Sequence, residues 1–147
     1  MNFETYHITT SEEYDYCVQR GIEPLIDDKF TIDIKLRVEL QEDKFGSRKK
    51  ITARNQKFFH WVWLHKEHFC EECGRPLTEY SATFCSHILS RGAHPEMAID
   101  PRNINILCFN HHQQYEFGDR QSMRIFAKNQ QTIEKLKFDY SQLNIKQ

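Results

Sequence analysis

Apolar and polar residues alternate along residues 30–40, FTIDIKLRVEL. Every second position from Phe30 to Leu40 is apolar, and the positions between them are polar or charged. A period of two is typical of a β-strand with one buried face, because successive side chains point to opposite sides of a sheet. We therefore predict a strand over about 30–40, and we expect it to pair with another N-terminal segment around Thr5–Thr9.

Helical signals occur elsewhere in the chain. Ser11 is a suitable N-cap for a short helix over Ser11–Gln19, because its hydroxyl can accept a hydrogen bond from the first turn. Ser47 can cap a longer helix over about 48–66, and residues 119–147 predict one or two further helices. One face of the longer helix consists of Ile51, Asn55, Phe58, Val62 and His65.

Charge is unevenly distributed along the chain. The net charge is only −1, but residues 1–43 carry 11 acidic and 4 basic side chains, whereas residues 44–147 carry 16 basic and 10 acidic ones. This division predicts an acidic N-terminal extension over 1–46 and a weakly basic domain over 47–147. A locally basic surface attracts polyanions even when the total charge is close to zero. The alternative is solvated surface charge that is unevenly spread and has no binding role.

The composition is that of an ordinary soluble protein, with 39% hydrophobic and 28% charged residues in a chain of 147. No apolar run approaches the ~18 residues that a membrane helix needs. The first residues, MNFETYHITTSEEYDY, lack the basic and apolar regions of a secretory signal. We therefore expect a cytoplasmic protein without membrane contact, whose five cysteines are better explained as metal ligands than as disulfides. Cys17 and Cys85 are expected to pack as small buried residues.

Four residues form two pairs with the spacing of a zinc site. Two residues separate Cys70 from Cys73, and two residues separate Cys108 from His111. Zinc prefers four thiolate or imidazole ligands in a tetrahedron, and pairs of this kind supply them. We predict a structural Zn²⁺ bound by these four residues. The alternative is that Cys108 and the neighbouring histidines are merely buried.

Three more polar residues occur in a fixed order around the second pair: His87, then Asn103, and then His112 directly after His111. A histidine, an asparagine and a histidine combined with two zinc-ligand pairs resemble the HNH (ββα-metal) endonucleases, over about residues 48–118. The stretch SHILSRGAHPEMAIDPRNINILC is also similar to phage recombination nucleases of the NinG/Rap type, which act on branched DNA.

The resemblance implies an α+β fold with a ββα-metal (HNH) nuclease core and a zinc-knuckle clip, an N-terminal strand and helix extension, and a C-terminal helix. Residues 81–89, SATFCSHIL, alternate in polarity and supply the first strand of this core. Residues 103–108, NINILC, supply the second strand or its approach, and residues 111–117 supply the metal-binding helix.

The resemblance also implies roles for the three polar residues. His87 is expected to be the general base that takes a proton from the attacking water. Asn103 is expected to hold the loop and to orient the His87 ring through a hydrogen bond. His112 is expected to bind a catalytic divalent metal, Mg²⁺ or another. Helix spacing, and not the resemblance, adds Glu116 as a candidate second ligand, because it lies four residues later on the same face; the alternative is a solvent-facing helix residue. Ser86 stands where many family members have an acidic metal ligand, and it is a poor ligand for Mg²⁺.

A DNA substrate follows from the same resemblance, and RNA stays open as an alternative. Basic side chains near the predicted site are candidates for phosphate contacts, although those on the helix at 48–66 can equally form a solvated surface. These candidates are Arg48, Lys49, Lys50, Arg54, Arg91 and Arg102.

The function predicted from the sequence is that of a metal-dependent HNH endonuclease that hydrolyses DNA phosphodiester bonds. The alternative is a catalytically inactive zinc-binding module that interacts with DNA or protein, and Ser86 favours this alternative. The oligomeric state and the preferred DNA target are not specified by the sequence.

Overall fold

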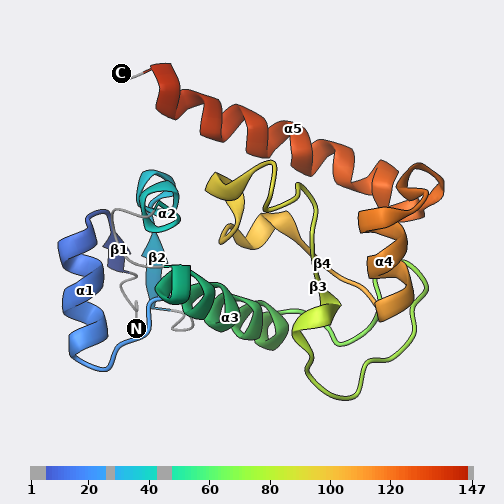
Figure 1. The fold of residues 1–147 in the computed structure, drawn as a ribbon, viewed down its shortest axis with the longest axis horizontal. Helices are drawn as coiled ribbons and strands as arrows, with labels where there is room; N and C mark the ends of the chain where they lie inside the picture. Colours follow the sequence, from blue (N-terminus) through green and yellow to red (C-terminus); the bar gives the residue numbers. More distant parts are fainter. Residues whose placement is uncertain (1–5, 26–28, 43–47, 146–147) are drawn as a thin grey trace, which may run out of the picture.

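The computed structural model describes residues 6–25, 29–42 and 48–145, which form a mixed α+β fold with five α-helices and two small sheets (Figure 1). The predicted α+β class is confirmed at this level. The strands are β1 (Tyr6–Ile8), β2 (Phe30–Ile32), β3 (Cys85–His87) and β4 (Ile104–Ile106). The helices are α1 (Ser11–Gln19), α2 (Ile34–Leu40), α3 (Arg48–His65), α4 (Phe109–Phe117) and α5 (Arg124–Ile145). Short 3₁₀ turns occur at Ala82–Phe84, Pro95–Met97, Pro101–Asn103 and Arg120–Ser122.

The predicted strand over 30–40 is wrong beyond Ile32, because the chain turns into α2. Asp33 stops the strand and caps the helix, since its carboxylate accepts a hydrogen bond from the backbone N–H of Lys35 at 3.2 Å. The extended part pairs as expected with the N-terminal segment, and β1 and β2 lie parallel with Ile8 opposite Ile32.

The alternating pattern of α2 has a helical explanation. On a helix, residues four apart share a face, so Leu36 and Leu40 form one apolar stripe and Ile34 and Val38 form another. Leu36 and Leu40 belong to the main hydrophobic core, whereas Ile34 and Val38 pack against a second cluster that includes Leu136 of α5. Because both stripes are buried, apolar residues recur at every second position of this helix, as they do in a strand with one buried face.

The predicted helices at 11–19 and 48–66 are present as α1 and α3. The cap of α1 is Thr10 rather than Ser11, since the Thr10 hydroxyl accepts a hydrogen bond from the N–H of Glu13 at 3.2 Å. The predicted cap Ser47 lies outside the described residues. The C-terminal region forms α5 as a single long helix, which runs from near α4 toward α2 in Figure 1.

The central strands are shorter than predicted. The segment predicted as a strand over 81–89 starts as a 3₁₀ turn, which the Ser81 hydroxyl caps, and only Cys85–His87 are extended. This strand pairs in antiparallel fashion with β4, with His87 opposite Ile104. The helix predicted at 111–117 is α4, which begins two residues earlier, at Phe109.

One hydrophobic core joins the N-terminal elements to the rest of the described chain. Ile8, Cys17 and Leu36 from the predicted acidic extension cluster with Phe58 of α3 and Ile104 of β4. Cys17 and Cys85 are both buried, as predicted. Among the described residues, no helix is both long enough and apolar enough to cross a membrane.

A buried ionic network reinforces the contact between α2, the loop before β4, and α5. The Asp100 carboxylate is fully buried and accepts bonds from Arg37 at 3.0 Å, from Arg102 at 2.8 Å and from the Tyr140 hydroxyl at 2.9 Å. Arg102 also pairs with Asp139 at 2.5 Å. Burial acts to raise the pKa of Asp100, but the hydrogen bond from Arg102 and the charge of Arg37 outweigh it and lower that pKa.

Candidate metal centre and neighbouring cleft

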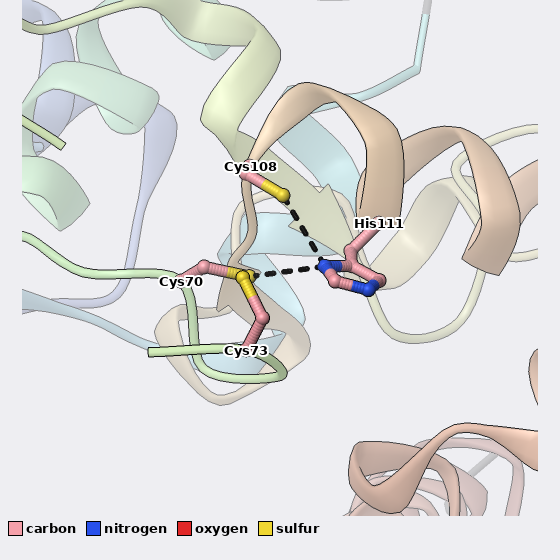
Figure 2. A group of neighbouring side chains, drawn as sticks. All are labelled: Cys70, Cys73, Cys108 and His111. Atoms are coloured by element: carbon pink, nitrogen blue, oxygen red, sulfur yellow. Dashed lines mark hydrogen bonds between the residues drawn. The ribbon is translucent and has the colours of Figure 1, made fainter. Parts of the chain in front are cut away.

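The two predicted ligand pairs come together in the fold. Figure 2 shows the side chains of Cys70, Cys73, Cys108 and His111 pointing toward one another. Their ligand atoms all lie within 4.8 Å of one another, and Nδ1 of His111 is 3.6 Å from Sγ of Cys70 and 3.2 Å from Sγ of Cys108. Cys70 and Cys108 are buried, whereas Cys73 is exposed.

Local backbone bonds shape the turn that carries the first pair, here called the cysteine knuckle (residues 68–77). The N–H of Cys70 donates to the carbonyl of Arg75, and the N–H of Gly74 donates to the carbonyl of Cys70, both at 2.8 Å. Gly74 has a φ of +77°, a left-handed conformation that glycine adopts without the steric cost of a Cβ. These contacts fold Cys73 back beside Cys70.

The second pair depends on the start of α4. Cys108 is the N-cap residue with extended backbone, and His111 lies in the first turn of the helix. The N–H of His112 bonds to the carbonyl of Cys108 at 2.9 Å, which fixes the turn between them. Helix geometry therefore directs His111, and not His112, to the cysteines.

The donor set fits a zinc ion. Zinc bonds of about 2.3 Å to sulfur and about 2.0–2.1 Å to nitrogen in a tetrahedron place sulfur and nitrogen roughly 3.5 Å apart. The two measured separations, 3.6 and 3.2 Å, bracket this value. A hydrogen bond from the backbone N–H of Arg75 lowers the pKa of the Cys73 thiol, whereas burial raises that of Cys108. The cluster can therefore hold a metal ion such as zinc.

The cysteine knuckle is bonded to β4 through Glu71. The N–H of Glu71 donates to the carbonyl of Ile106 at 2.8 Å, and the Glu71 carboxylate accepts from the N–H of Ile106. Lys66, just before the knuckle, donates to the carbonyl of Ile104 at 2.6 Å. The segment that carries Cys70 and Cys73 is therefore attached to β4, the strand that pairs with β3 and lies opposite His87.

A cleft of about 540 Å³ lies beside the metal cluster, between β3 and α4. Five polar residues with acid–base or charged side chains line it, together with the rings of Phe59 and Tyr115. These five residues are His87 from β3, Arg91 from the following loop, His112 and Glu116 from α4, and Arg120 from the 3₁₀ turn after α4.

His87 is held as a neutral imidazole with one nitrogen left to accept a proton. Its Nε2 lies 3.0 Å from the carbonyl oxygen of Ala98, and because a carbonyl only accepts, Nε2 carries the hydrogen. Phe59 packs edge-on against the ring, with centroids 5.5 Å apart. Burial lowers the pKa of His87 below its usual value near 6.5, which keeps Nδ1 unprotonated at neutral pH.

Asn103 does not bond to the His87 ring, contrary to the prediction. Its fully buried amide instead accepts from the N–H of Leu89 at 2.8 Å and donates to the carbonyls of Leu89 at 3.0 Å and Met97 at 3.2 Å. Ala98, which orients His87, follows Met97 directly. Asn103 thus holds the loop as predicted, and its effect on His87 passes through that loop.

His112 and Glu116 face each other on α4. Nδ1 of His112 lies 2.5 Å from the carbonyl oxygen of Thr83, so this nitrogen carries the hydrogen and Nε2 is directed elsewhere. Nε2 lies 3.3 Å from a carboxylate oxygen of Glu116. Ser86 is buried in β3, and His94 pairs with Glu96 and does not line the cleft.

The basic candidates divide into two groups. Arg48, Lys49 and Lys50 are exposed at the start of α3, and Arg91 lines the cleft. Arg54 is buried and donates to the carbonyl of Leu40 at 2.9 Å, so the prediction of a phosphate contact does not suit it.

Arg102 is likewise committed to protein partners, because it pairs with Asp100 and Asp139. A run of basic residues in the sequence does not show which of their side chains face the core. Arg120 lines the cleft, and the sequence interpretation missed it. Arg120 could have been proposed from the sequence, because it lies two residues after Gly118, where the helix that carries His112 ends.

Comparison with known proteins finds no matching family model, no matching curated protein and no matching solved structure.

Proposed function

We propose that this chain is a metal-dependent endonuclease of the HNH type that hydrolyses phosphodiester bonds in DNA. One observation carries the proposal: His87 and the His112–Glu116 pair, from different elements, open onto the same cleft. The antiparallel pair β3–β4 followed by α4 supports a ββα-metal core, because it presents the first histidine on a strand and the second on the helix.

His87 is the general base of the proposed reaction. Nδ1 accepts a proton from the attacking water, while Nε2 keeps its bond to the Ala98 carbonyl. That carbonyl also stabilises the imidazolium that forms, since it accepts from the opposite side of the ring. The Phe59 ring and the bonded loop limit the motion of His87, which preserves the alignment needed for proton transfer.

His112 and Glu116 are the residues that would hold a catalytic divalent cation. Nε2 of His112 and the Glu116 carboxylate lie 3.3 Å apart and supply a nitrogen and an oxygen donor, which suits Mg²⁺ or Mn²⁺ with water and phosphate completing the shell. Such an ion, when bound, stabilises negative charge on the phosphoryl group and on the leaving oxygen. The Thr83 carbonyl fixes the tautomer of His112 that leaves Nε2 available.

The cluster of Cys70, Cys73, Cys108 and His111 has a structural role in this proposal. It lies outside the set of residues that line the cleft and provides four protein ligands, which leaves no open position for substrate. Zinc at this position would fix the start of α4, and thereby the position of His112.

The second candidate is a zinc-binding interaction module without catalysis. The buried Ser86 favours it, because no acidic residue of β3 joins His112 and Glu116 as a metal ligand. With only two protein ligands, the affinity for Mg²⁺ depends on the substrate phosphate.

A cleavage assay separates the two candidates. Supercoiled, linear and four-way-junction DNA, and an RNA of matched sequence, are incubated with zinc-loaded protein in Mg²⁺, in Mn²⁺ or without either cation. We expect metal-dependent cleavage of DNA by the wild type and its loss in His87→Ala, with His7→Ala, an exposed histidine of β1, as the matched control. Cleavage that persists in His87→Ala contradicts the mechanism, and no cleavage of any substrate favours the interaction module.

A further inference from the structure

The cleft contains two arginines whose surroundings differ from those of three other arginines, which bond to groups within the fold. Arg37 and Arg102 are paired with carboxylates, and Arg54 donates to a backbone carbonyl. Within residues 6–25, 29–42 and 48–145, neither Arg91 nor Arg120 forms an ion pair or a side-chain hydrogen bond. Two guanidinium groups without acidic partners in one cleft attract an anion.

The fold fixes the backbone around Arg91 and the side chain of Arg120. Arg91 belongs to a turn in which the Ser90 hydroxyl accepts from the N–H of Ala93 at 3.2 Å. Arg120 packs its guanidinium over the ring of Tyr115, with 5.4 Å from Cζ to the ring centroid, and a cation–π contact of this kind restricts its rotamers.

The cleft also contains the carboxylate of Glu116, whose negative charge restricts the kind of anion that can bind there. Glu116 is paired with His112 and not with either arginine. A bare anion next to Glu116 is repelled, whereas an anion that shares a cation with Glu116 is attracted by the cation and by both arginines. A phosphodiester strand has this property, because one phosphate can meet the cation while its neighbours meet the guanidinium groups.

We infer that Arg91 and Arg120 bind the phosphates that flank the reacting phosphodiester, so that the substrate is a polynucleotide strand and not an isolated phosphodiester. This inference rests on the proposed function for the position of the reacting group. Guanidinium groups bind phosphate oxygens through two parallel hydrogen bonds, which lysine cannot reproduce.

The test compares two substrates and two properties. Arg91→Gln and Arg120→Gln are assayed for cleavage of a duplex oligonucleotide and for hydrolysis of bis(p-nitrophenyl) phosphate, which has no flanking phosphates. Binding of the same duplex to zinc-loaded protein is measured without added Mg²⁺ or Mn²⁺ and without a chelator, over a range of salt concentrations. The matched control is Arg20→Gln, because Arg20 lies over the ring of Tyr16 at 4.7 Å, outside the cleft.

Each cleft variant is expected to lose about tenfold or more in kcat/KM on the oligonucleotide, as for a lost charge-assisted hydrogen bond. Hydrolysis of the small diester should fall far less than cleavage of the oligonucleotide, because this substrate has no flanking phosphates; a small change is expected for Arg91→Gln, since burial and, to a smaller extent, the charge of Arg91 lower the pKa of His87. When the logarithm of the duplex-binding constant is plotted against the logarithm of the salt concentration, the magnitude of the slope should fall by about 0.9 for each arginine removed. Arg20→Gln should change neither kcat/KM on the oligonucleotide nor this slope. His87→Ala serves as the contrast, because it should abolish the hydrolysis of both substrates.

Equal losses on both substrates would overturn the inference, because they would place the arginines on the reacting phosphoryl group. Cleavage and salt dependence like those of Arg20→Gln would overturn it as well. A wild type that cleaves neither substrate refutes the proposed nuclease function and not the phosphate contacts. In that case the salt dependence of duplex binding decides whether the two arginines bind the phosphate backbone.

Discussion

The carboxylate of Glu72 lies 2.5 Å from the backbone nitrogen of Arg124, the first residue of α5. Its second oxygen accepts from the N–H of Ile125 at 3.3 Å, and the Glu72 carbonyl accepts from the Arg124 guanidinium. A carboxylate at this position satisfies amides that have no partner within the helix and complements the helix dipole. The cysteine knuckle therefore provides the cap of α5 from a distant part of the sequence.

Replacing Glu72 should weaken the attachment of α5. We expect Glu72→Ala to lower the free energy of unfolding by about 1 kcal/mol, as for the loss of an N-cap, and Glu72→Gln to have a smaller effect because an acceptor oxygen remains. Urea unfolding measures the change, and Glu67→Ala, an exposed glutamate before the knuckle, is the control. A Glu72→Ala variant as stable as this control would refute the cap.

Metal binding should depend on the four clustered residues and on no other cysteine. Elemental analysis is expected to find one zinc per chain in the wild type, and little in Cys70→Ser or Cys108→Ser, because a hydroxyl is a poor zinc ligand. Cys85→Ser is the matched control, since Cys85 is equally buried but bonds to the carbonyl of Phe59. Since zinc binding contributes to folding, the first two variants should also melt at a lower temperature. Full zinc occupancy in Cys108→Ser would contradict the ligand set.

Sequence patterns were most informative where the chemistry is local. The spacing of Cys70, Cys73, Cys108 and His111 was sufficient to predict the metal cluster, because metal ligands must converge whatever the surrounding fold. The alternation over 30–40 was misleading, because the same residues satisfy two buried faces of a helix once Asp33 caps it. The decisive information was the second hydrophobic cluster on α5, which is distant in sequence.

Long-range contacts also decided which basic residues are available. Arg54 and Arg102 look no different from Arg48 or Arg91 in the sequence, but the first two bond to Leu40 and to Asp100 inside the fold. The link from Asn103 to His87 could not be predicted in its true form either. It depends on the path of the loop through Met97 and Ala98, which no spacing rule specifies.

The buried network around Asp100 should be important for stability. Asp100→Asn leaves the Arg37 guanidinium without its carboxylate partner in a site where Asp100 is fully buried, and breaking such a pair costs about 3–5 kcal/mol. Asp139→Asn, at a more exposed carboxylate that also binds Arg102, should cost about 1 kcal/mol or less. Chemical denaturation at neutral pH compares the two variants, and equal losses would contradict the importance of burial.

The low pKa of Asp100 also gives this network a pH dependence. A carboxylate whose pKa is lowered by folding stabilises the native state above its usual pKa near 3.8, and this contribution is lost as the pH falls through the lowered value. The free energy of unfolding of Asp100→Asn should therefore change less than that of the wild type on acidification below pH 4. Parallel profiles for the two proteins would mean that Asp100 does not titrate with unfolding.

The buried His87 should have a pH signature of the same sign, but in a higher pH range. Because burial lowers its pKa, the unfolded chain binds a proton just below pH 6.5 that the native state does not. The native state therefore loses stability as the pH falls from 6.5 toward the lowered pKa, by at most about 1.4 kcal/mol per pH unit. His87→Gln should remove this part of the loss, and its amide can still donate to the Ala98 carbonyl. The measurement is the unfolding free energy of zinc-loaded protein at several pH values between 5 and 7.

The same protonation should limit catalysis, so the acid limb of kcat/KM for DNA cleavage should lie below pH 6.5. An acid limb above that value, or identical stability profiles for wild type and His87→Gln, would contradict a His87 that burial keeps neutral.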